Sequence, residues 1–433
     1  MDNYFKKILR RKLYYFAAAV VKKYKPDIIG ITGSMGKTST KDAVYCVLGK
    51  SGLKVRKNIK NYNNEIGVPL TIIGKEAAGR NIFKWFLILG RALRLLVFKD
   101  RNYPDVVILE MASDRKGDID YLTRLAPIKI GIVTNISTVH TEFLGSTANI
   151  AQEKSFLVKN IIPGGFAILN HDDELVLKMK GLTQETTFTF GFSPDADFTA
   201  GNLNLLYKEE DYNVKGVSFD ASYRGKTTKF FLPQVLGSHL VYSVLPAIIS
   251  GLLYKMDSEK IVSALREYVS PRGRMRIVPG IKDTQIIDDT YNSSPLACKV
   301  ALKTLGEIRL PEKFKRYAVL GDMLELGSIS EEAHKEVGKA VFSYGADVLI
   351  CVGERARDIA RGALSAGMPS ENIFTFSDRV AAGKFLQQRM KTKDIILVKG
   401  SQGMRMETIV REIMAEPENA EQLLVRQEPG WQK

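Results

Sequence analysis

The stretch GITGSMGKTST, from Gly30 to Thr40, contains the residue types that hold a phosphate group. Its glycines let backbone amides approach phosphate oxygens, its lysine neutralises negative charge, and the threonine after that lysine is placed to bind Mg²⁺. These residues are Gly33, Gly36, Lys37 and Thr38. The apolar run DIIGIT before the loop and a helical pattern after it give the strand, loop and helix that a phosphate loop requires. The stretch therefore predicts a nucleotide site, with a chance match in a solvated turn as the alternative.

The spacing of this loop differs by one residue from the common phosphate-loop pattern. That pattern has a glycine, four further residues and then Gly-Lys, and Ile31 stands where the first glycine belongs. Gly30 lies one place too early. The two later glycines, the lysine and the start of the following helix still form a cradle, so we expect the shortened loop to hold phosphate.

A carboxylate and an imidazole follow the next two apolar runs. Glu110 ends DVVILE, Thr134 and Asn135 end IKIGIVTN, and His140 comes five residues later. The carboxyl ends of parallel strands share one edge of a sheet, so these side chains are expected beside the loop. Mg²⁺ prefers oxygen ligands, and this set can complete a divalent-metal site. The alternatives are a capping or ion-pairing carboxylate and an ordinary loop histidine; together with Lys37 the pattern favours the metal site.

The remaining histidines and the cysteines do not form a metal or redox motif. His171 lies in a predicted turn, His239 at a helix start and His334 on a predicted solvent-facing helix surface, so structural roles are expected. The cysteines are far apart and form no CxxC pair, which argues against a disulfide framework or a zinc ribbon. They are Cys46, Cys298 and Cys351. A reducing cytoplasm fits this pattern.

The chain is strongly basic, with 63 basic against 48 acidic residues and a formal net charge of +15. Such a charge attracts nucleotides, nucleic acid or an anionic membrane. No RNA-stacking motif or basic-aromatic patch is present, so no nucleic-acid partner is expected. The lysines that follow YYFAAAVV argue against a secretory signal, and no uncharged stretch reaches the roughly 20 residues that span a bilayer.

The 433 residues are too many for one core, and their patterns divide them into three parts. Residues 1–26 are predicted to form a basic amphipathic helix. Residues 27–272 hold the loop, the buried strands of a parallel α/β sheet, and a small antiparallel sheet between Thr186 and Leu232. After the linker SPRGRMR, residues 273–433 alternate five predicted strands with helices, which is typical of a second doubly wound unit. The tail after Glu416 is expected to be loosely ordered.

Further motifs follow in a fixed order between about residues 26 and 412. They are NYNNEIGVPLT (61–71), LEMASDRKGDI (109–119), VTNISTVHTEFLGS (133–146), AQEKSFL (151–157), ILNHDDE (168–174), DDTYNSSP (288–295), LGDMLELG (320–327) and VKGSQGMRME (398–407). With the shortened loop TGSMGKT, they resemble the Mur ligases, ATP-dependent enzymes that form amide bonds in peptidoglycan synthesis. The resemblance implies a P-loop-containing central domain with a parallel and a small antiparallel sheet, followed by a Rossmann-like C-terminal ligase domain.

The resemblance also implies an activity. ATP would phosphorylate a peptide carboxylate, and an amine would then attack the acyl phosphate to give an amide and inorganic phosphate. The last three motifs point to the branch that uses ATP and Mg²⁺ to add D-alanyl-D-alanine to a UDP-N-acetylmuramoyl tripeptide. One alternative is a related amino-acid or γ-glutamyl ligase with a different carboxylate acceptor. The other is a basic membrane or nucleic-acid binding protein with a vestigial ATP site.

Matching positions receive roles from the resemblance. The implied ATP-binding residues are Thr32, Gly33, Ser34, Gly36, Lys37, Thr38, Ser39, Asn135, Arg274, Asp289 and Asn292. The implied catalytic residues are Lys37, Glu110, His140 and Lys154. The implied metal ligands are Thr38 and Glu110 for one Mg²⁺, His140 for a second, and Lys154 if it is carbamylated rather than an ordinary exposed helix lysine. The implied substrate contacts are Asn64, Glu65, Tyr291, Lys399 and Ser401.

Four positions depart from the family pattern. Leu240 and Ser243 stand where asparagines near the nucleotide are usual, Gln402 replaces an arginine, and Ala112 replaces a glycine. These changes bear on the adenine or ribose contact and on how the amine is held. The domain that grips uridine diphosphate in typical members is expected to be absent, with the basic N-terminal helix in its place.

The segment RNIFKWFLILGRALRLLVFKDR is a second basic stretch. Helical spacing places its cations on one face and its apolar residues on the opposite one. The cations are Arg80, Lys84, Arg91, Arg94 and Arg101, and the apolar residues are Ile82, Phe86, Leu89, Leu93 and Leu96. Such a helix can lie on an anionic membrane, where a lipid-linked precursor would be, or it can pack its apolar face on the sheet. We therefore expect a cytoplasmic protein and leave peripheral membrane contact through the two basic helices open.

Overall fold

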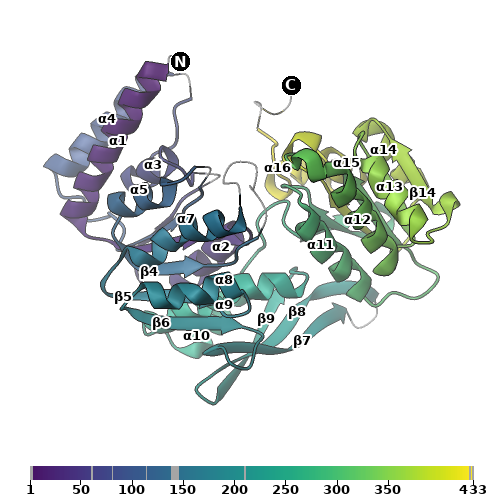
Figure 1. The fold of residues 1–433 in the computed structure, drawn as a ribbon, viewed down its shortest axis with the longest axis horizontal. Helices are drawn as coiled ribbons and strands as arrows, with labels where there is room; N and C mark the ends of the chain where they lie inside the picture. The colour runs from purple at the N-terminus through teal and green to yellow at the C-terminus, as the bar shows by residue number, and fades with distance from the viewer. Residues whose placement is uncertain are drawn as a thin grey trace. The chain divides into compact units, whose positions relative to one another are not determined.

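The computed structural model describes residues 3–59, 62–79, 81–113, 115–137, 146–208, 211–428 and 431 (Figure 1). The chain divides into two compact units. The first comprises Met1–Asn202, Phe219–Phe230 and Leu240–Tyr268. The second comprises Leu203–Ser218, Phe231–His239 and Val269–Lys433.

Within the described residues, the larger sheet has nine strands in the order β2-β3-β1-β4-β5-β6-β7-β8-β9. Neighbouring strands from β2 to β6 are parallel, which confirms the predicted α/β class. Strands β1, β3 and β4 are buried almost throughout, as expected for continuous apolar runs covered on both faces. The bounds are β1 (Asp27–Thr32), β2 (Val55–Lys57), β3 (Val106–Glu110), β4 (Ile128–Val133), β5 (Ile161–Asn170), β6 (Thr186–Gly191), β7 (Phe198–Lys208), β8 (Asp211–Tyr223) and β9 (Lys226–Pro233).

The register of the central strands sets the place of the site. Ile31 of β1 lies opposite Glu110 of β3, and Thr32 lies opposite Val133 of β4. All three strands therefore end at the same edge of the sheet, where the loop from Gly33 begins. Within the region predicted to form a small antiparallel sheet, Arg224 and Gly225 join β8 to β9 with φ angles of 48° and 76°. Positive φ at both central residues is the geometry of a tight hairpin turn.

Helices pack on this sheet through apolar side chains. One core cluster joins α1, α5 and α7 to the sheet, with Ala17, Ile119 and Leu157 beside Val107 and Leu109. Helix α2 packs beside β3 and α10. The helix bounds are α1 (Asn3–Tyr24), α2 (Lys37–Leu48), α3 (Gly67–Ile73), α4 (Ile82–Val97), α5 (Asp118–Leu125), α7 (Thr147–Lys159), α8 (Glu174–Leu177), α9 (Ser238–Leu253) and α10 (Ser258–Arg266).

The second unit contains a sheet with the order β10-β11-β15-β12-β13-β14 in the described chain. Its strands are parallel except for β10, which pairs antiparallel with β11 at one edge. The strand bounds are β10 (Arg276–Gly280), β11 (Thr284–Asp289), β12 (Arg316–Gly321), β13 (Val348–Val352), β14 (Ile373–Phe376) and β15 (Ile395–Lys399). The helix bounds are α11 (Pro295–Glu307), α12 (Ser330–Ser343), α13 (Ala356–Ser365), α14 (Arg379–Arg389), α15 (Glu407–Ile413) and α16 (Ala420–Leu423). The predicted doubly wound unit is confirmed, with β10 as an unpredicted edge strand that contains Pro279, a residue tolerated at a sheet edge.

The C-terminal tail was expected to be loosely ordered, and this prediction is wrong. Ala420 and Leu424 are 3% and 0% exposed and belong to the core of the second unit. Arg426 is buried as well. The described part of the tail, through residue 428, is ordered because it supplies side chains to this core, which its polar composition does not reveal.

Helix α4 also differs from its prediction. Its buried residues Trp85, Ile88 and Ala92 pack with α1 and α3 rather than on the sheet. Ile82, Phe86 and Leu93, which were expected to form the packing or membrane face, are exposed. The helix therefore has apolar side chains on two sides, and the single-face prediction is wrong.

Candidate functional site

The phosphate loop connects β1 to α2 and depends on two glycines. Gly36 has a φ of 79° and precedes the first residue of α2. Gly33 has a φ of 147°, and a Cβ atom added there would lie 1.9 Å from Oγ1 of Thr134. A side chain at either position would be strained, and at Gly33 it would also collide with the end of β4. The structure thus explains why glycine is needed at both predicted positions.

The end of β4 holds the loop in place. The Ser34 amide donates to the carbonyl oxygen of Asn135 at 2.8 Å, and the Met35 amide donates to Oδ1 of Asn135 at 2.7 Å. The Thr134 hydroxyl donates to the carbonyl oxygen of Met35 at 2.5 Å. Asn135, predicted to bind ATP, therefore shapes the loop in this structure.

Lys37 is folded back over its own loop. Its Nζ atom donates to the carbonyl oxygens of Gly33 at 2.6 Å and Ser34 at 3.2 Å. Thr38 follows in the first turn of α2, where the helix dipole favours negative charge. On either side, Thr32 donates to the carbonyl oxygen of Met111 at 2.9 Å, and buried Ser39 accepts from Tyr268 through its carbonyl at 3.3 Å. These residues lie where the sequence predicts a nucleotide phosphate site.

Glu110 ends β3 and is 3% exposed. Asn63 donates to its Oε1 atom at 3.0 Å, and Oε2 lies 3.7 Å from Nζ of Lys41. Within the described residues, no hydrogen bond reaches the buried Oε2 atom. Asn58 fixes the backbone of Glu110 by accepting from its amide at 2.9 Å and donating to its carbonyl at 3.2 Å. The carboxylate is therefore held firmly, with one oxygen able to accept a cation.

The predicted metal ligands are only partly described. The buried Oε2 atom of Glu110 and the hydroxyl of Thr38, in the first turn of α2, are oxygen atoms of the kind that Mg²⁺ prefers as ligands. His140 lies outside the described residues. Across those that are described, no group of three or more His, Cys, Asp or Glu side chains could hold a metal. Lys154 on α7 is 4% exposed, so the alternative of an ordinary exposed lysine is wrong.

The two predicted substrate residues of the first unit have local contacts. Asn64 accepts from the amides of Ile66 at 3.2 Å and Gly67 at 3.0 Å, and so supports the start of α3. Glu65 lies 3.7 Å from Arg10 of α1, and both side chains are about half exposed. Their substrate roles stay predictions.

The second unit brings three predicted residues together at the ends of β11 and β15. Asp289 and Lys399 are partners in the parallel register, and Nζ of Lys399 donates to Oδ2 of Asp289 at 2.6 Å. The same ammonium donates to the carbonyl oxygen of Asn292 at 2.9 Å. The Lys399 side chain is 2% exposed, so this pair is buried. The amide of Gln402 donates to Oδ1 of Asn292 at 3.4 Å.

The other predicted residues of this unit lie on adjoining loops. The guanidinium of Arg274 is 4.1 Å from the ring centroid of Tyr291, a cation–π distance. Ser401 accepts from the Leu324 amide through its hydroxyl at 2.8 Å, and its own amide donates to the carbonyl oxygen of Asp322 at 3.0 Å. Ser401 therefore ties together the loops after β12 and β15.

Two ionisable groups of the second unit have shifted pKa values. Burial raises the pKa of Asp288 to about 6, although Thr290 and Gly273 donate hydrogen bonds to its carboxylate. Burial lowers the pKa of His239 to about 4, partly offset by the charge of Asp289. His239 at the start of α9 is thus neutral at pH 7, in keeping with its predicted structural role.

His334 was predicted to face solvent, and this prediction is wrong. Its side chain is fully buried, Nε2 accepts from the Met323 amide at 2.9 Å, and Nδ1 lies 2.7 Å from the carbonyl oxygen of Ser330. The face of α12 that carries His334 packs inward because the imidazole satisfies the backbone after β12. His171 lies 3.8 Å from Asp172, after the end of β5, as expected for a turn residue.

The structure also describes the surroundings of three positions that depart from the family pattern. Leu240 and Ser243 are each 3% exposed on α9. A Cβ atom added to Gly36 would lie 3.4 Å from the Ser243 hydroxyl, so Ser243 borders the phosphate loop. The amide of Ala112 donates to the carbonyl oxygen of Asn63 at 2.9 Å, which links the residues after β3 to the Glu110 surroundings.

Sequence reasoning missed Lys41 and the tail residue Arg426. Lys41 lies four residues after Lys37 on α2, one helical turn further, and that spacing was the available signal. Arg426 donates to the carbonyl oxygens of Thr290 at 2.5 Å and Tyr291 at 3.0 Å, and pairs with buried Glu407 at 2.9 Å. The tail thereby holds the loop that carries Tyr291. No local pattern signals a contact across 136 positions.

Comparison with known proteins assigns two consecutive domains to the chain. A model of the Mur ligase middle domain matches residues 31–83 and 91–251, and a model of the Mur ligase glutamate ligase domain matches residues 273–402. The chain is 29% identical over 405 residues to UDP-N-acetylmuramoyl-tripeptide--D-alanyl-D-alanine ligase of Bacillus subtilis, covering 94% of this chain and 79% of that one. It is 30% identical over 404 residues to the ligase of the same name from Synechocystis, covering 93% and 78%. The crystal structure of MurF ligase from Thermotoga maritima in complex with ADP shares the fold, with a TM-score of 0.76, 24% identity and coverage of 95% and 84%.

Replacing Lys41 with methionine should destabilise the protein. The substitution leaves Glu110 buried without its cation, so the free energy of unfolding should fall by about 3 kcal/mol. Denaturant titration without ATP or divalent ions measures this, because a bound cation would replace the lost charge. Lys50→Met is the matched control, since Lys50 and Glu267 form an exposed pair at 2.8 Å that should contribute less than about 1 kcal/mol. Equal losses in the two variants would contradict the assigned role of Lys41.

Replacing Arg426 with alanine should release the loop at Tyr291. Buried Glu407 would keep Arg405, which donates to its Oε1 atom at 2.6 Å, but its Oε2 atom would lose a donor. The carbonyl oxygens of Thr290 and Tyr291 would also lose their donor, so the free energy of unfolding should fall by about 3 kcal/mol. Hydrogen exchange of the Tyr291 amide should become faster. Arg411→Ala removes an exposed arginine from the neighbouring helix α15 and should change stability by less than about 0.5 kcal/mol. An unchanged exchange rate in Arg426→Ala would mean that the tail does not hold this loop.

Proposed function

This chain belongs to the Mur ligase family, and from that premise we propose that it is an ATP-dependent ligase that adds D-alanyl-D-alanine to a UDP-N-acetylmuramoyl tripeptide. The observation that carries the proposal is the match over 93% of the chain to a ligase of that name, with the phosphate loop intact. Beside that loop, Glu110 is buried and held in position. The reaction class is the formation of an amide bond at the expense of ATP.

The first chemical step places negative charge against negative charge. An acceptor carboxylate oxygen attacks the γ-phosphorus of ATP, the bond to the bridging oxygen breaks, and ADP leaves. Lys37 and the amino end of α2 stabilise the phosphate charge in this step, because fixed dipoles and a positioned cation need no reorganisation. The carbonyl oxygens of Gly33 and Ser34 hold the Lys37 ammonium above the loop.

In the second step the amine nitrogen attacks the acyl carbon. The bond from that carbon to the phosphate oxygen breaks, giving the amide, inorganic phosphate and a proton. We propose that Tyr291, Lys399 and Ser401 of the second unit bind the amine substrate. The support is positional: Lys399 is buried and oriented by Asp289, and Ser401 is fixed two residues further along. Asn64 and Glu65 stay proposed contacts of the acceptor.

The nucleotide contacts are assigned in both units. In the first unit they comprise Thr32, Gly33, Ser34, Gly36, Lys37, Thr38, Ser39 and Asn135. In the second unit they comprise Arg274, Asp289 and Asn292. The support for the second set is that Arg274 stacks near Tyr291 and that Lys399 bridges Asp289 and Asn292.

We propose that Mg²⁺ is held by the Thr38 hydroxyl and by Glu110. When bound, the ion neutralises phosphate charge, and the buried Oε2 atom of Glu110 is the observation that supports its place. His140 is proposed as a ligand of a second ion on its sequence position alone. Lys154 is proposed to carry a carbamate because it matches the family motif, and its side chain is buried on α7 rather than exposed to solvent.

The proposed domain boundaries follow residues 26 and 272, giving a helix at 1–26, a central domain at 27–272 and a C-terminal domain at 273–433. The extents of the two matching family models support them.

Among the described helices, none is both long enough and apolar enough to cross a bilayer. We propose that the protein works in the cytoplasm, where ATP is available, and that it touches an anionic membrane at its periphery through α1 and α4. The observation that favours this contact is the exposed apolar surface of α4.

Phosphate release from ATP with paired substrates tests the proposed reaction. D-alanyl-D-alanine with the muramoyl tripeptide should stimulate release and yield a pentapeptide product by mass spectrometry. Lys37→Ala should lower kcat/KM by at least about 100-fold, because one positioned donor to the transition state is lost. Lys178→Ala removes an exposed lysine from the same unit and should retain full activity.

The outcomes separate the enzyme from its substrates. Stimulation by another amine and carboxylate, but not by this pair, would reject the specificity and keep the ligase. Activity of Lys37→Ala within about 10-fold of wild type, or 1.4 kcal/mol, would reject the site.

Carbamylation of Lys154 should be visible without an activity assay. Protein incubated with ¹³C-bicarbonate should show a carbamate carbon resonance that is absent from Lys154→Ala. Removal of carbon dioxide should lower ligase activity, and bicarbonate should restore it. A spectrum identical to that of the variant would reject the modification, and Lys159→Ala, at the end of the same helix, serves as the control.

A further inference from the structure

The outer side of α4 is an exposed apolar surface. Its three phenylalanines, Phe83, Phe86 and Phe98, are 71%, 66% and 66% exposed. Single exposed apolar residues are common, but a contiguous group of large ones marks an interaction surface. We name this surface the outer α4 face and define it by Ile82, Phe83, Phe86, Leu87, Leu93, Val97 and Phe98.

The opposite side of α4 is already used for packing. Trp85, Ile88 and Ala92 pack in one cluster with Leu9 and Leu13 of α1. The outer α4 face is therefore a second apolar surface, separate from the side by which α4 packs on the protein. A helix with apolar side chains on two sides needs hydrophobic surroundings on both, and the protein supplies them on one side only.

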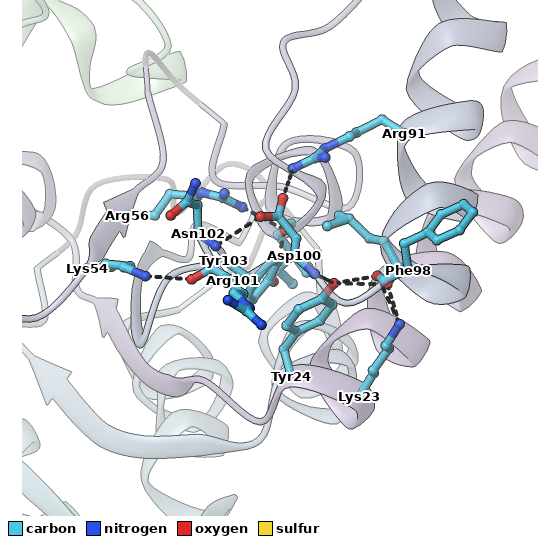
Figure 2. A network of polar contacts seen from close by, with 12 residues as sticks. Lys23, Tyr24, Lys54, Arg56, Arg91, Phe98, Asp100, Arg101, Asn102 and Tyr103 are labelled. Carbon is cyan, nitrogen blue, oxygen red and sulfur yellow. Dashed lines mark hydrogen bonds and ion pairs between the residues drawn. The ribbon is translucent and has the colours of Figure 1, made fainter.

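A polar network fixes the angle at which α4 is presented (Figure 2). Lys23 of α1 donates to the carbonyl oxygens of Leu95 and Leu96, both at 2.8 Å, and of Phe98 at 3.1 Å. Arg91 pairs with Asp100 at 2.7 Å, and Tyr24 accepts from the Asp100 amide at 2.8 Å. The carboxyl end of α4 is thus anchored to α1 by a cation and hydrogen bonds, so the outer α4 face is a rigid surface.

The surroundings of this face are strongly basic. Helix α1 has seven basic and no acidic residues, and the segment from Ile82 to Arg101 has five basic and one acidic, so these two segments carry eleven of the fifteen net positive charges. The single acid, Asp100, is paired with Arg91. Exposed cations next to the outer α4 face are Lys84, Arg94, Lys99 and Arg101. An apolar surface with a cationic margin is complementary to an anionic lipid bilayer.

We propose that the outer α4 face is a monotopic membrane anchor. Its apolar side chains enter the boundary between headgroups and acyl chains of an anionic bilayer, and the cations of α4 and α1 contact lipid phosphates. The helix lies in the plane of the membrane, since its 16 residues extend only about 24 Å and a spanning helix needs about 30 Å. This inference rests on the proposed peripheral contact, replaces its single-face geometry, and is independent of which substrates the enzyme joins.

Flotation of the full chain with lipid vesicles tests the anchor. Wild-type protein should float at low salt with phosphatidylcholine vesicles that contain phosphatidylglycerol, and far less with phosphatidylcholine alone. Phe83→Gln/Phe86→Gln should weaken binding on the order of 100-fold, because two large side chains no longer leave water. Ile329→Gln/Leu364→Gln is the matched control, since these residues are 57% and 55% exposed in the second unit. The control should bind like wild type.

A charge variant tests the lipid headgroup contact. Lys84→Gln/Arg94→Gln/Lys99→Gln should bind the anionic vesicles at least about 10-fold more weakly, with a smaller dependence on salt. Ligase activity of both α4 variants with soluble substrates should match wild type, which separates the anchor from the proposed reaction. If wild-type protein also shows no ligase activity with these substrates, the proposed reaction is rejected. The vesicle-binding result would still support the anchor.

Two results would overturn the anchor. One is the failure of wild-type protein to float with anionic vesicles at low salt. The other is equal vesicle binding by wild type and Phe83→Gln/Phe86→Gln. If the wild type instead forms concentration-dependent dimers that this variant loses, and does not float, the outer α4 face belongs to a second copy of the chain.

Discussion

A carboxylate buried at the end of a parallel strand must be compensated, and Glu110 shows how the first unit meets this constraint. Lys41 provides charge, Asn63 provides a hydrogen bond, and Asn58 satisfies the backbone on both sides. Because β1 and β3 are in register, the carboxylate lies opposite Ile31 and cannot move away from the loop without a slip of the whole sheet. The same contacts that make burial tolerable therefore hold the functional group in position.

The second unit solves the same problem twice. Lys399 compensates Asp289 across adjacent parallel strands, and Glu407 is compensated by Arg405 nearby and by Arg426 from the C-terminal tail. Buried ion pairs add little net stability, but removal of one partner destabilises the fold strongly. Conformations in which the two buried charges do not meet are therefore much higher in free energy. Here they fix the strand ends and the loop at Tyr291. Among the described residues no ion pair with Asp288 is present, and burial raises the pKa of Asp288 to about 6.

Local patterns were sufficient where local physics decides the structure. Continuous apolar runs predicted β1, β3 and β4, and the glycines, lysine and threonine predicted the loop that follows β1. Contacts between distant segments were out of reach, because Arg426 meets Thr290 across 136 positions and a polar tail gives no sign of it. Periodicity also failed for α4, since its apolar residues lie on two sides and the pattern does not show which side packs. His334 failed for a related reason: only the fold supplies the Met323 amide that its imidazole accepts.

The lysines around α4 favour a lipid surface over another protein as the partner of the outer α4 face. Protein interfaces are depleted in lysine, which keeps its strong hydration, and their centres avoid charge. The outer α4 face is bordered by Lys84 and Lys99, and the exposed part of α1 adds Lys7, Lys12 and Lys22. A long lysine side chain can keep its ammonium at the headgroup level while its stem lies along apolar groups, so this margin costs little at a lipid surface. At the phosphate loop, by contrast, the positive potential comes from backbone amides and Lys37. The proposed membrane contact therefore explains the excess charge of the chain better than nucleotide binding does.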